Sequence, residues 1–215
     1  MSDTGTSKPR GPRPRGSVRR ALVEAGVSLA RSGGPDAVVL REVTRAVGVV
    51  PNAAYRHFND REALLGAVRD AALAMLAARM ADGMNQVVAG NRPAEDALLR
   101  LRAVGAAYLA FAREEPGLFD TAFTTTTDLH LSTADSPDPD SPFDHLRMAL
   151  AKLVDTGVIT AERQAVIEYP IWAGVHGTAT LLRGPLSSRP EQAKRDLENQ
   201  VLDLIGSAVW PQPAG

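Results

Sequence analysis

The sequence predicts an all-α fold, with a small N-terminal helical unit followed by a larger helical body. Apolar residues recur at helical spacing, as at Val18, Leu22, Ala25 and Leu29, which fall on one face of a helix. Glycine and proline separate the helical segments, for example at residues 33–35. No alternation typical of a strand continues for more than a few residues, and we find no internal repeat.

The same periodicity predicts where the helices lie. Ser17 can cap the first helix, and Asn59 with Glu62 resembles a capping box for a long one. Pro170 is expected to kink its helix or to mark its start. Residues 124–142 are rich in Thr, Ser, Asp and Pro, which predicts a flexible loop inside the body. The expected helices span residues 18–31, 40–47, 51–58, 59–80, 95–114, 143–155, 161–183 and 190–209.

The charges divide the chain into a basic head and an acidic body. Residues 1–61 hold eleven Lys and Arg against five Asp and Glu, and residues 62–215 hold thirteen against twenty. This split indicates that the head meets a polyanion, although charge also fluctuates along any chain. Residues 1–16 are Pro- and Gly-rich and predict a disordered basic arm. Its Arg10, Arg13 and Arg15 either enter a minor groove or belong to a solvated tail.

Composition excludes several kinds of site. The chain has no cysteine, which excludes disulfides, thiolate catalysis and Cys-ligated zinc. Its four histidines show no metal-ligand spacing, and no nucleophile–base constellation is visible. We therefore expect no metal, no cofactor and no enzymatic activity. The N-terminus is polar and no apolar run is long enough for a membrane span, so we expect a cytoplasmic protein with no membrane partner.

The segment 40–65, LREVTRAVGVVPNAAYRHFNDREALL, has the layout of a helix-turn-helix. Two short helices are separated by a turn at Gly48, because glycine tolerates the positive φ that such turns often need. The second helix is too short to be stable alone, so the neighbouring helices must carry it. Its surroundings offer donors to a major groove and to phosphates, whereas Phe58 is expected to be core. The candidate DNA contacts are Arg41, Arg45, Asn52, Ala53, Tyr55, Arg56, His57 and Arg61.

The run G-V-x-P-x-x-x-Y-R-H-F-x-x-R-E-x-L-L within this segment strongly resembles the DNA-binding domain of TetR-family regulators. This resemblance covers roughly residues 18–70. A weaker one lies at residues 171–182, where Trp172, His176 and Gly177 look like the W-x-x-x-H-G pattern of one TetR ligand-binding subclass. The positions that match in the first run are Tyr55, His57, Phe58, Arg61, Glu62 and Leu64.

The resemblance implies a ligand-responsive repressor that binds a palindromic operator in double-stranded DNA as a homodimer. It assigns residues 17–62 to DNA binding and 63–210 to binding of a small apolar or amphipathic effector and to dimerisation through the last two helices. It implies phosphate contacts from Tyr55, His57 and Arg61. The base or groove contacts that it implies come from Asn52, Ala53, Arg56 and Arg41.

Three residues depart from the family pattern. Val39 and Val50 stand where the family often places Ser or Thr as N-caps of the two motif helices. Loss of such a cap typically costs about 1 kcal/mol. Thr44 replaces the small alanine that is usual where the two helices cross. We therefore expect a softer motif with fewer phosphate contacts.

The body offers a candidate ligand pocket and a candidate dimer interface. In the pocket, His176 is a polar group among the apolar walls Phe111, Phe119, Phe123, Leu146, Met148 and Trp172. Alternatively, His176 is hydrogen-bonded within helix packing and the aromatic residues are core. The interface combines Gly174, Thr178 and Leu181 with Leu197, Val201, Leu204 and Ala208, for which packing within one chain is the alternative.

Two other functions are also compatible with the sequence. The same head could serve activation or global DNA organisation, which the position of the binding site relative to a promoter would separate. The other alternative is a small-molecule-binding or catalytic helical protein whose head has lost DNA binding, and Val39 and Val50 give it some weight. The basic head argues against this second alternative.

Overall fold

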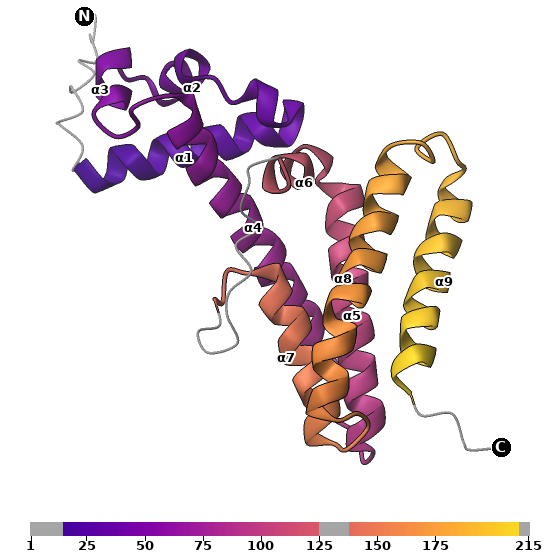
Figure 1. Cartoon of the computed structure of the whole chain (residues 1–215). Helices are drawn as coiled ribbons and strands as arrows, with labels where there is room; N and C mark the ends of the chain where they lie inside the picture. The colour runs from indigo at the N-terminus through magenta and orange to yellow at the C-terminus, as the bar shows by residue number, and fades with distance from the viewer. Residues whose placement is uncertain (1–14, 125–137, 211–215) are drawn as a thin grey trace, which may run out of the picture.

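The computed structural model describes residues 15–124 and 138–210, and within these ranges every regular element is a helix, as predicted (Figure 1). The elements are α1 (Arg15–Gly33), the short 3-10 helix η1 (Pro35–Ala37), α2 (Leu40–Val47), α3 (Pro51–Tyr55), α4 (Arg61–Asn85), α5 (Pro93–Glu114), α6 (Pro116–Ala122), α7 (Pro142–Asp155), α8 (Ala161–Arg183) and α9 (Glu191–Val209).

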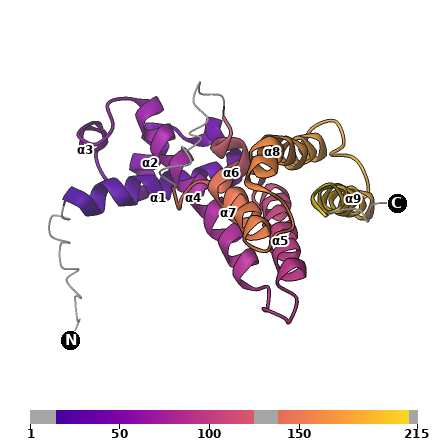
Figure 2. The same cartoon turned by 60° about the horizontal axis from the view of Figure 1, so that its bottom comes forward.

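The helices form a head and a body joined by α4. Helices α1, α2 and α3 gather at one end of the molecule, and α4 runs from them into the body (Figure 1). In the body, α5 packs against α4, α7 and α8, whereas α9 lies at the outer edge beside α5 and α8 (Figure 2). The predicted domain boundary at residues 62–63 falls inside the first turn of α4, which is continuous from head to body.

Apolar side chains from both parts form one core along α4. Leu22 of the head and Leu64, Leu76 and Met80 of α4 are all buried completely or nearly so. Tyr108 of α5 is equally buried. Helix α4 is therefore a packed structural element along its length, which suits it to connect the two parts mechanically.

The short helix α6 is absent from the sequence-based expectation, which placed only a break near Pro116. Proline is compatible with the first turn of a helix, because its missing N–H would have no helical partner there. Helix α6 packs against α1 and α4, at the junction of head and body. It also carries Phe119 into the core of the body.

The structure corrects two further local expectations, for the cap of α4 and the start of α1, and it excludes one of the two alternatives for Pro170. The long helix is capped by Asp60 rather than Asn59, since the Asp60 carboxylate accepts a hydrogen bond from the Ala63 amide at 2.7 Å. Helix α1 begins at Arg15, three residues before the expected start. Pro170 lies in the interior of α8 and does not mark its start.

Parts of two predicted segments lie outside the described residues. For the basic arm these are residues 1–14, and for the expected loop they are residues 125–137. Across the described ranges, no helix combines the length and the apolar character needed to cross a membrane. The same ranges contain no cluster of three side chains that could ligate a metal ion.

Candidate nucleic-acid interface and ligand cavity

The turn between α2 and α3 depends on Gly48. Its backbone is left-handed, with φ 73° and ψ 35°, a conformation that side chains with a Cβ rarely adopt. Its amide donates to the Thr44 carbonyl at 3.0 Å, and the next amide, of Val49, donates to the same carbonyl at 3.1 Å. The prediction that glycine makes this turn is confirmed, and the turn fixes the direction in which α3 leaves α2.

Both motif helices begin without a side-chain cap. Val39 and Val50 occupy the N-cap positions of α2 and α3 in extended conformations, as the sequence predicted. Thr44 is buried where α2 packs, and its hydroxyl donates to the Arg41 carbonyl at 2.9 Å. The valines leave the first amides of α2 and α3 without the acceptor that Ser or Thr would supply.

Several predicted DNA contacts lie exposed on the head. Asn52 and Arg56 of the α3 segment are exposed, and 53% of the Tyr55 surface is accessible. Ala53 and His57 are half-buried beside them. On α2, Arg41 is exposed, as is Arg45, which forms an ion pair with Glu42 at 2.5 Å. This surface offers amide, phenol and guanidinium donors close together, the groups that contact bases and phosphates.

Arg61 has an internal role that sequence reasoning missed. Its guanidinium donates to the carbonyl oxygens of Pro35 at 2.7 Å and Val38 at 3.0 Å. It also contacts the carboxylate of Glu62 at 3.0 Å. Arg61 therefore fastens the segment between α1 and α2 to the start of α4. Contact of Arg61 with phosphate stays a prediction.

Phe58 is a core aromatic residue, as expected. Its ring is 3% exposed, and the guanidinium of Arg19 lies 4.6 Å from the ring centroid. This contact connects the segment after α3 to α1, and it gives so short a helix as α3 the tertiary support that it needs.

An aromatic cluster occupies the body between α5, α6 and α8. The rings of Trp172 and His176 stack one helical turn apart, with centroids 6.2 Å apart and planes within 5°. Phe123 contacts the His176 ring at 4.8 Å, and Phe119 lies 5.8 Å from it. Tyr108 of α5 completes the cluster, and a hydrogen bond of 2.7 Å joins its hydroxyl to Nδ1 of His176.

Burial keeps both polar members of the cluster uncharged at neutral pH. It raises the pKa of the Tyr108 phenol well above its usual value. It also lowers the pKa of the His176 imidazole. With the imidazole proton on Nε2, Nδ1 accepts the hydrogen bond from the Tyr108 hydroxyl.

The lowered pKa of His176 predicts acid sensitivity of the fold. The unfolded chain takes up this proton at a higher pH than the folded chain does. The contribution of the neutral imidazole to the free energy of unfolding is therefore fully present above about pH 6.5 and decreases as the pH drops below it. When the pH is lowered from about 7.5 to about 5.5, we expect the thermal unfolding midpoint of His176→Gln to fall less than that of the wild type. Parallel pH profiles of the two proteins would contradict this assignment.

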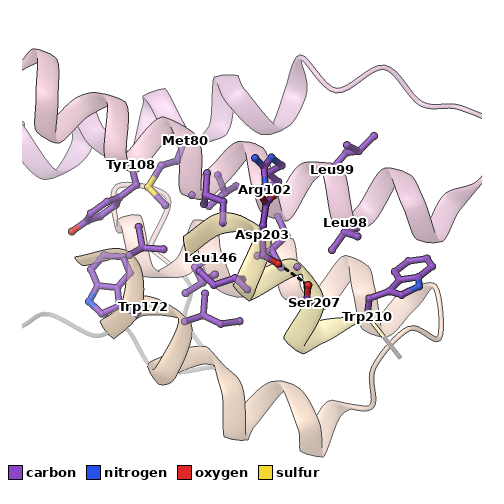
Figure 3. Close-up of a pocket in the computed structure, with 18 residues that line it drawn as sticks. Met80, Leu98, Leu99, Arg102, Tyr108, Leu146, Trp172, Asp203, Ser207 and Trp210 are labelled. Atoms are coloured by element: carbon purple, nitrogen blue, oxygen red, sulfur yellow. Dashed lines mark hydrogen bonds and ion pairs between the residues drawn. The ribbon is translucent and has the colours of Figure 1, made fainter. Parts of the chain in front are cut away.

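A cavity of about 550 Å³ opens between α5, α8 and α9, beside this cluster (Figure 3). Its size is typical of sites for small molecules. Tyr108 and Trp172 belong to both the cluster and the cavity wall. Much of the remaining wall is aliphatic, and it includes Leu98, Leu101, Val104, Leu146, Ile171, Val175, Leu202 and Ile205.

The predicted pocket residues therefore divide into three sets. Leu146 and Trp172 line the cavity, whereas Phe119, Phe123 and His176 form the adjoining aromatic cluster. Phe111 is buried in the core without lining the cavity, and Met148 is 38% exposed. The sequence missed the contribution of α9, which supplies Leu202, Asp203, Ile205, Gly206 and Ser207.

The outer faces of α8 and α9 carry exposed apolar side chains. Leu204 is 70% exposed and Leu181 is 47% exposed, and Gly174 and Ala208 are also exposed. Leu197 and Val201 are half-buried. Thr178 of the predicted interface is instead buried within the protomer, where its hydroxyl donates to the Gly174 carbonyl at 2.7 Å.

Two family models match the sequence. The model described as "Bacterial regulatory proteins, tetR family" matches residues 22–68, and "Tetracyclin repressor-like, C-terminal domain" matches residues 101–204. Together they cover most of the chain, and each coincides with one of the two parts seen in the structure. No curated protein matches the sequence significantly.

Solved structures share the fold over nearly the whole chain. A protein of unknown function from Rhodococcus sp. RHA1 is 22% identical with a TM-score of 0.68, and the match covers 95% of this chain and 97% of that one. A TetR family transcription regulator from Marinobacter aquaeolei VT8 is 19% identical with a TM-score of 0.58, covering 87% and 95%. RolR in complex with the ligand resorcinol is 15% identical with a TM-score of 0.54, covering 94% and 96%.

Proposed function

The chain belongs to the TetR family and is a DNA-binding transcriptional regulator, and we propose that it is a dimeric repressor that a small molecule releases from DNA. The observation that carries the proposal is the combination of an exposed α3 surface with a ligand-sized cavity in one chain. The exposed surface includes Asn52, Tyr55 and Arg56, and the cavity lies between α9 and the helices α5 and α8. Such a regulator acts in the cytoplasm, where bacterial DNA lies.

In this proposal α3 enters the major groove. The head carries the basic excess of the chain, which attracts the phosphate backbone. Asn52 and Arg56 suit bidentate contacts to adenine and guanine, and Arg41 suits a contact in the groove, whereas Tyr55 suits a contact to a flanking phosphate. The head is thus equipped for both affinity and sequence preference.

Dimerisation through α8 and α9 would pair two heads. Leu204 and Leu181 are large apolar residues on outer faces, and covering them in a second copy would remove that area from water. Two recognition helices about one DNA turn, or roughly 34 Å, apart would then read a palindrome. Gly174 and Ala208 allow the backbones of the two copies to approach closely.

The effector in this proposal occupies the cavity beneath α9. The aliphatic wall favours an apolar or amphipathic molecule. The fold is shared with RolR, whose structure contains the ligand resorcinol. Bound effector lowers DNA affinity only to the extent that it prefers one arrangement of the heads over another. We propose that Trp172 and His176 place the chain in the W-x-x-x-H-G subclass.

In vitro selection from random duplex DNA tests the proposed function. We expect an enriched palindrome whose half-sites are about one helical turn apart. Arg56→Ala should relax the preference at one position of each half-site, while Arg195→Ala on α9 serves as a control of equal charge change. Absence of enrichment at low salt would overturn the proposal and favour a ligand-binding protein whose head has lost DNA binding.

Restoring an N-cap on α3 should strengthen the head. Val50 is 69% exposed, so replacing it loses little apolar burial. We expect Val50→Ser to stabilise the fold by about 1 kcal/mol, because the serine hydroxyl can accept from the amide of Asn52 or Ala53 in the first turn of α3. Chemical unfolding measures this gain, and Val50→Ala is the control that removes the valine without adding a cap. Equal stability of the two variants would refute the capping argument.

A further inference from the structure

A single pair of opposite charges interrupts the apolar wall of the cavity beneath α9. Of the described residues that line the cavity, only Arg102 on α5 and Asp203 on α9 are charged. Their side chains meet at 2.5 Å between Nη1 and Oδ1, and Figure 3 shows them between Tyr108 and Trp172 on one side and Leu98 and Trp210 on the other. A ligand that fills the cavity therefore contacts this pair.

We propose that the cavity binds an elongated apolar carboxylic acid, whose carboxylate replaces Asp203 as the partner of Arg102. The inference rests on the proposed effector function, because it names the chemical class of molecule that the same cavity would take. It distinguishes an acid from a neutral or cationic molecule of the same shape.

The unequal exposure of the two charged groups favours an anion over a cation. The Arg102 side chain is 37% exposed, and that of Asp203 is 69% exposed. When the carboxylate of a ligand pairs with Arg102, the Asp203 side chain becomes solvated at a small cost in free energy, since exposed ion pairs contribute little to stability. A cation that paired with Asp203 would instead leave the more buried Arg102 without an anionic partner and beside a second positive charge.

Arg102 also has donors to spare. One terminal nitrogen donates to Asp203, and the other donates to the amide oxygen of Asn199 at 3.2 Å. A guanidinium has five N–H groups in a planar fork, which matches the two oxygens of a carboxylate. The Ser207 hydroxyl is already engaged with the main-chain oxygen of Asp203 at 2.9 Å. Arg102 is therefore the group in the wall that distinguishes an acid from a neutral molecule.

The apolar wall continues on both sides of the charged pair. Tyr108, Leu146 and Trp172 lie toward one end of the cavity, and Leu98 and Trp210 lie toward the other (Figure 3). A molecule anchored on Arg102 can thus extend an apolar chain along the wall. This arrangement suits an aliphatic acid better than a compact polar one.

Tryptophan fluorescence gives a direct test, because both tryptophans of the chain, Trp172 and Trp210, line the cavity. Octanoate and dodecanoate are titrated into the full-length protein below their micellar concentrations, alongside octan-1-ol and dodecan-1-ol. We expect at least one acid to bind about tenfold more tightly than its alcohol, a difference of about 1.4 kcal/mol. No binding of either acid, or equal binding of acid and alcohol, would overturn the proposal.

Variants at the charged pair identify the group responsible. Arg102→Gln should abolish the preference for the acid while leaving the affinity for the alcohol unchanged, and Arg102→Lys should retain part of it. Asp203→Asn should tighten binding of the acid, because it removes the competing carboxylate. An unchanged preference in Arg102→Gln, with an unchanged unfolding midpoint, would also overturn the proposal.

The same titrations separate this inference from the effector function. If acid and alcohol bind equally and both release DNA, the cavity is an effector site without the proposed preference for acids. If the acid binds through Arg102 but leaves DNA affinity unchanged, the ligand class is correct and the effector function is wrong.

Discussion

Gly117→Ala is expected to destabilise the protein by about 3 kcal/mol, because the added methyl group has no room between α6 and α1. A Cβ built on Gly117 would lie 2.2 Å from the carbonyl oxygen of Ala30 and 2.8 Å from that of Arg31. Both atoms are main chain, so one helix must move away from the other. Chemical unfolding of the purified protein measures this loss.

The same substitution should weaken DNA binding. Helix α6 joins the body to the head at this contact, and an ion pair between Arg31 and Glu115 at 2.7 Å lies beside it. A displaced α6 changes how α1, and with it the head, sits on the body. DNA affinity of the variant, measured under conditions where it is folded, reports this change.

Gly66→Ala is the matched control. Gly66 lies inside α4, and a Cβ built there meets nothing within 4 Å. Since alanine is favoured over glycine in a helix by about 1 kcal/mol, this variant should gain stability. If Gly117→Ala proved as stable as the wild type, the close approach of α6 to α1 would be wrong.

Arg113→Met is expected to cost about 3 kcal/mol, because it leaves a buried carboxylate without a partner. One terminal nitrogen of Arg113 contacts both carboxylate oxygens of Glu198 on α9, at 2.6 and 2.7 Å. Glu198 is only 8% exposed. The loss falls on the contact between α5 and α9, so we also expect weaker dimerisation, measured by sedimentation at several protein concentrations.

A double variant tests the origin of this effect. Combining Arg113→Met with Glu198→Met removes both charges, and apolar replacement of a buried pair is often nearly neutral. The double variant should therefore recover much of the lost stability, which a double-mutant cycle would quantify. Arg92→Ala, at the N-cap of the same helix, is the control, since its pair with Glu95 is exposed and contributes at most about 1 kcal/mol. No recovery in the double variant would contradict the buried-pair explanation.

The sequence by itself determined the helical class, most helix boundaries and the helix-turn-helix. These features depend on local signals, namely apolar periodicity, the Gly and Pro residues that separate the helices, and the positive φ of Gly48. The valine caps at Val39 and Val50 could also be predicted, because an N-cap is defined by its neighbours in the chain. Local signals did not predict α6, because this helix is only about two turns long and depends on its contacts with α1 and α4.

Only the tertiary structure decided what the body contains. The pair of Arg102 with Asp203 joins residues 101 positions apart, and Tyr108 meets His176 across 68 positions. Helical periodicity shows which face of a helix is apolar, but it does not show which other helix covers that face. For this reason the sequence placed Phe111 and Met148 in a pocket that α9 lines instead. Arg61 likewise makes contacts that the sequence did not indicate, because folding brings the carbonyl oxygens of Pro35 and Val38 to its guanidinium.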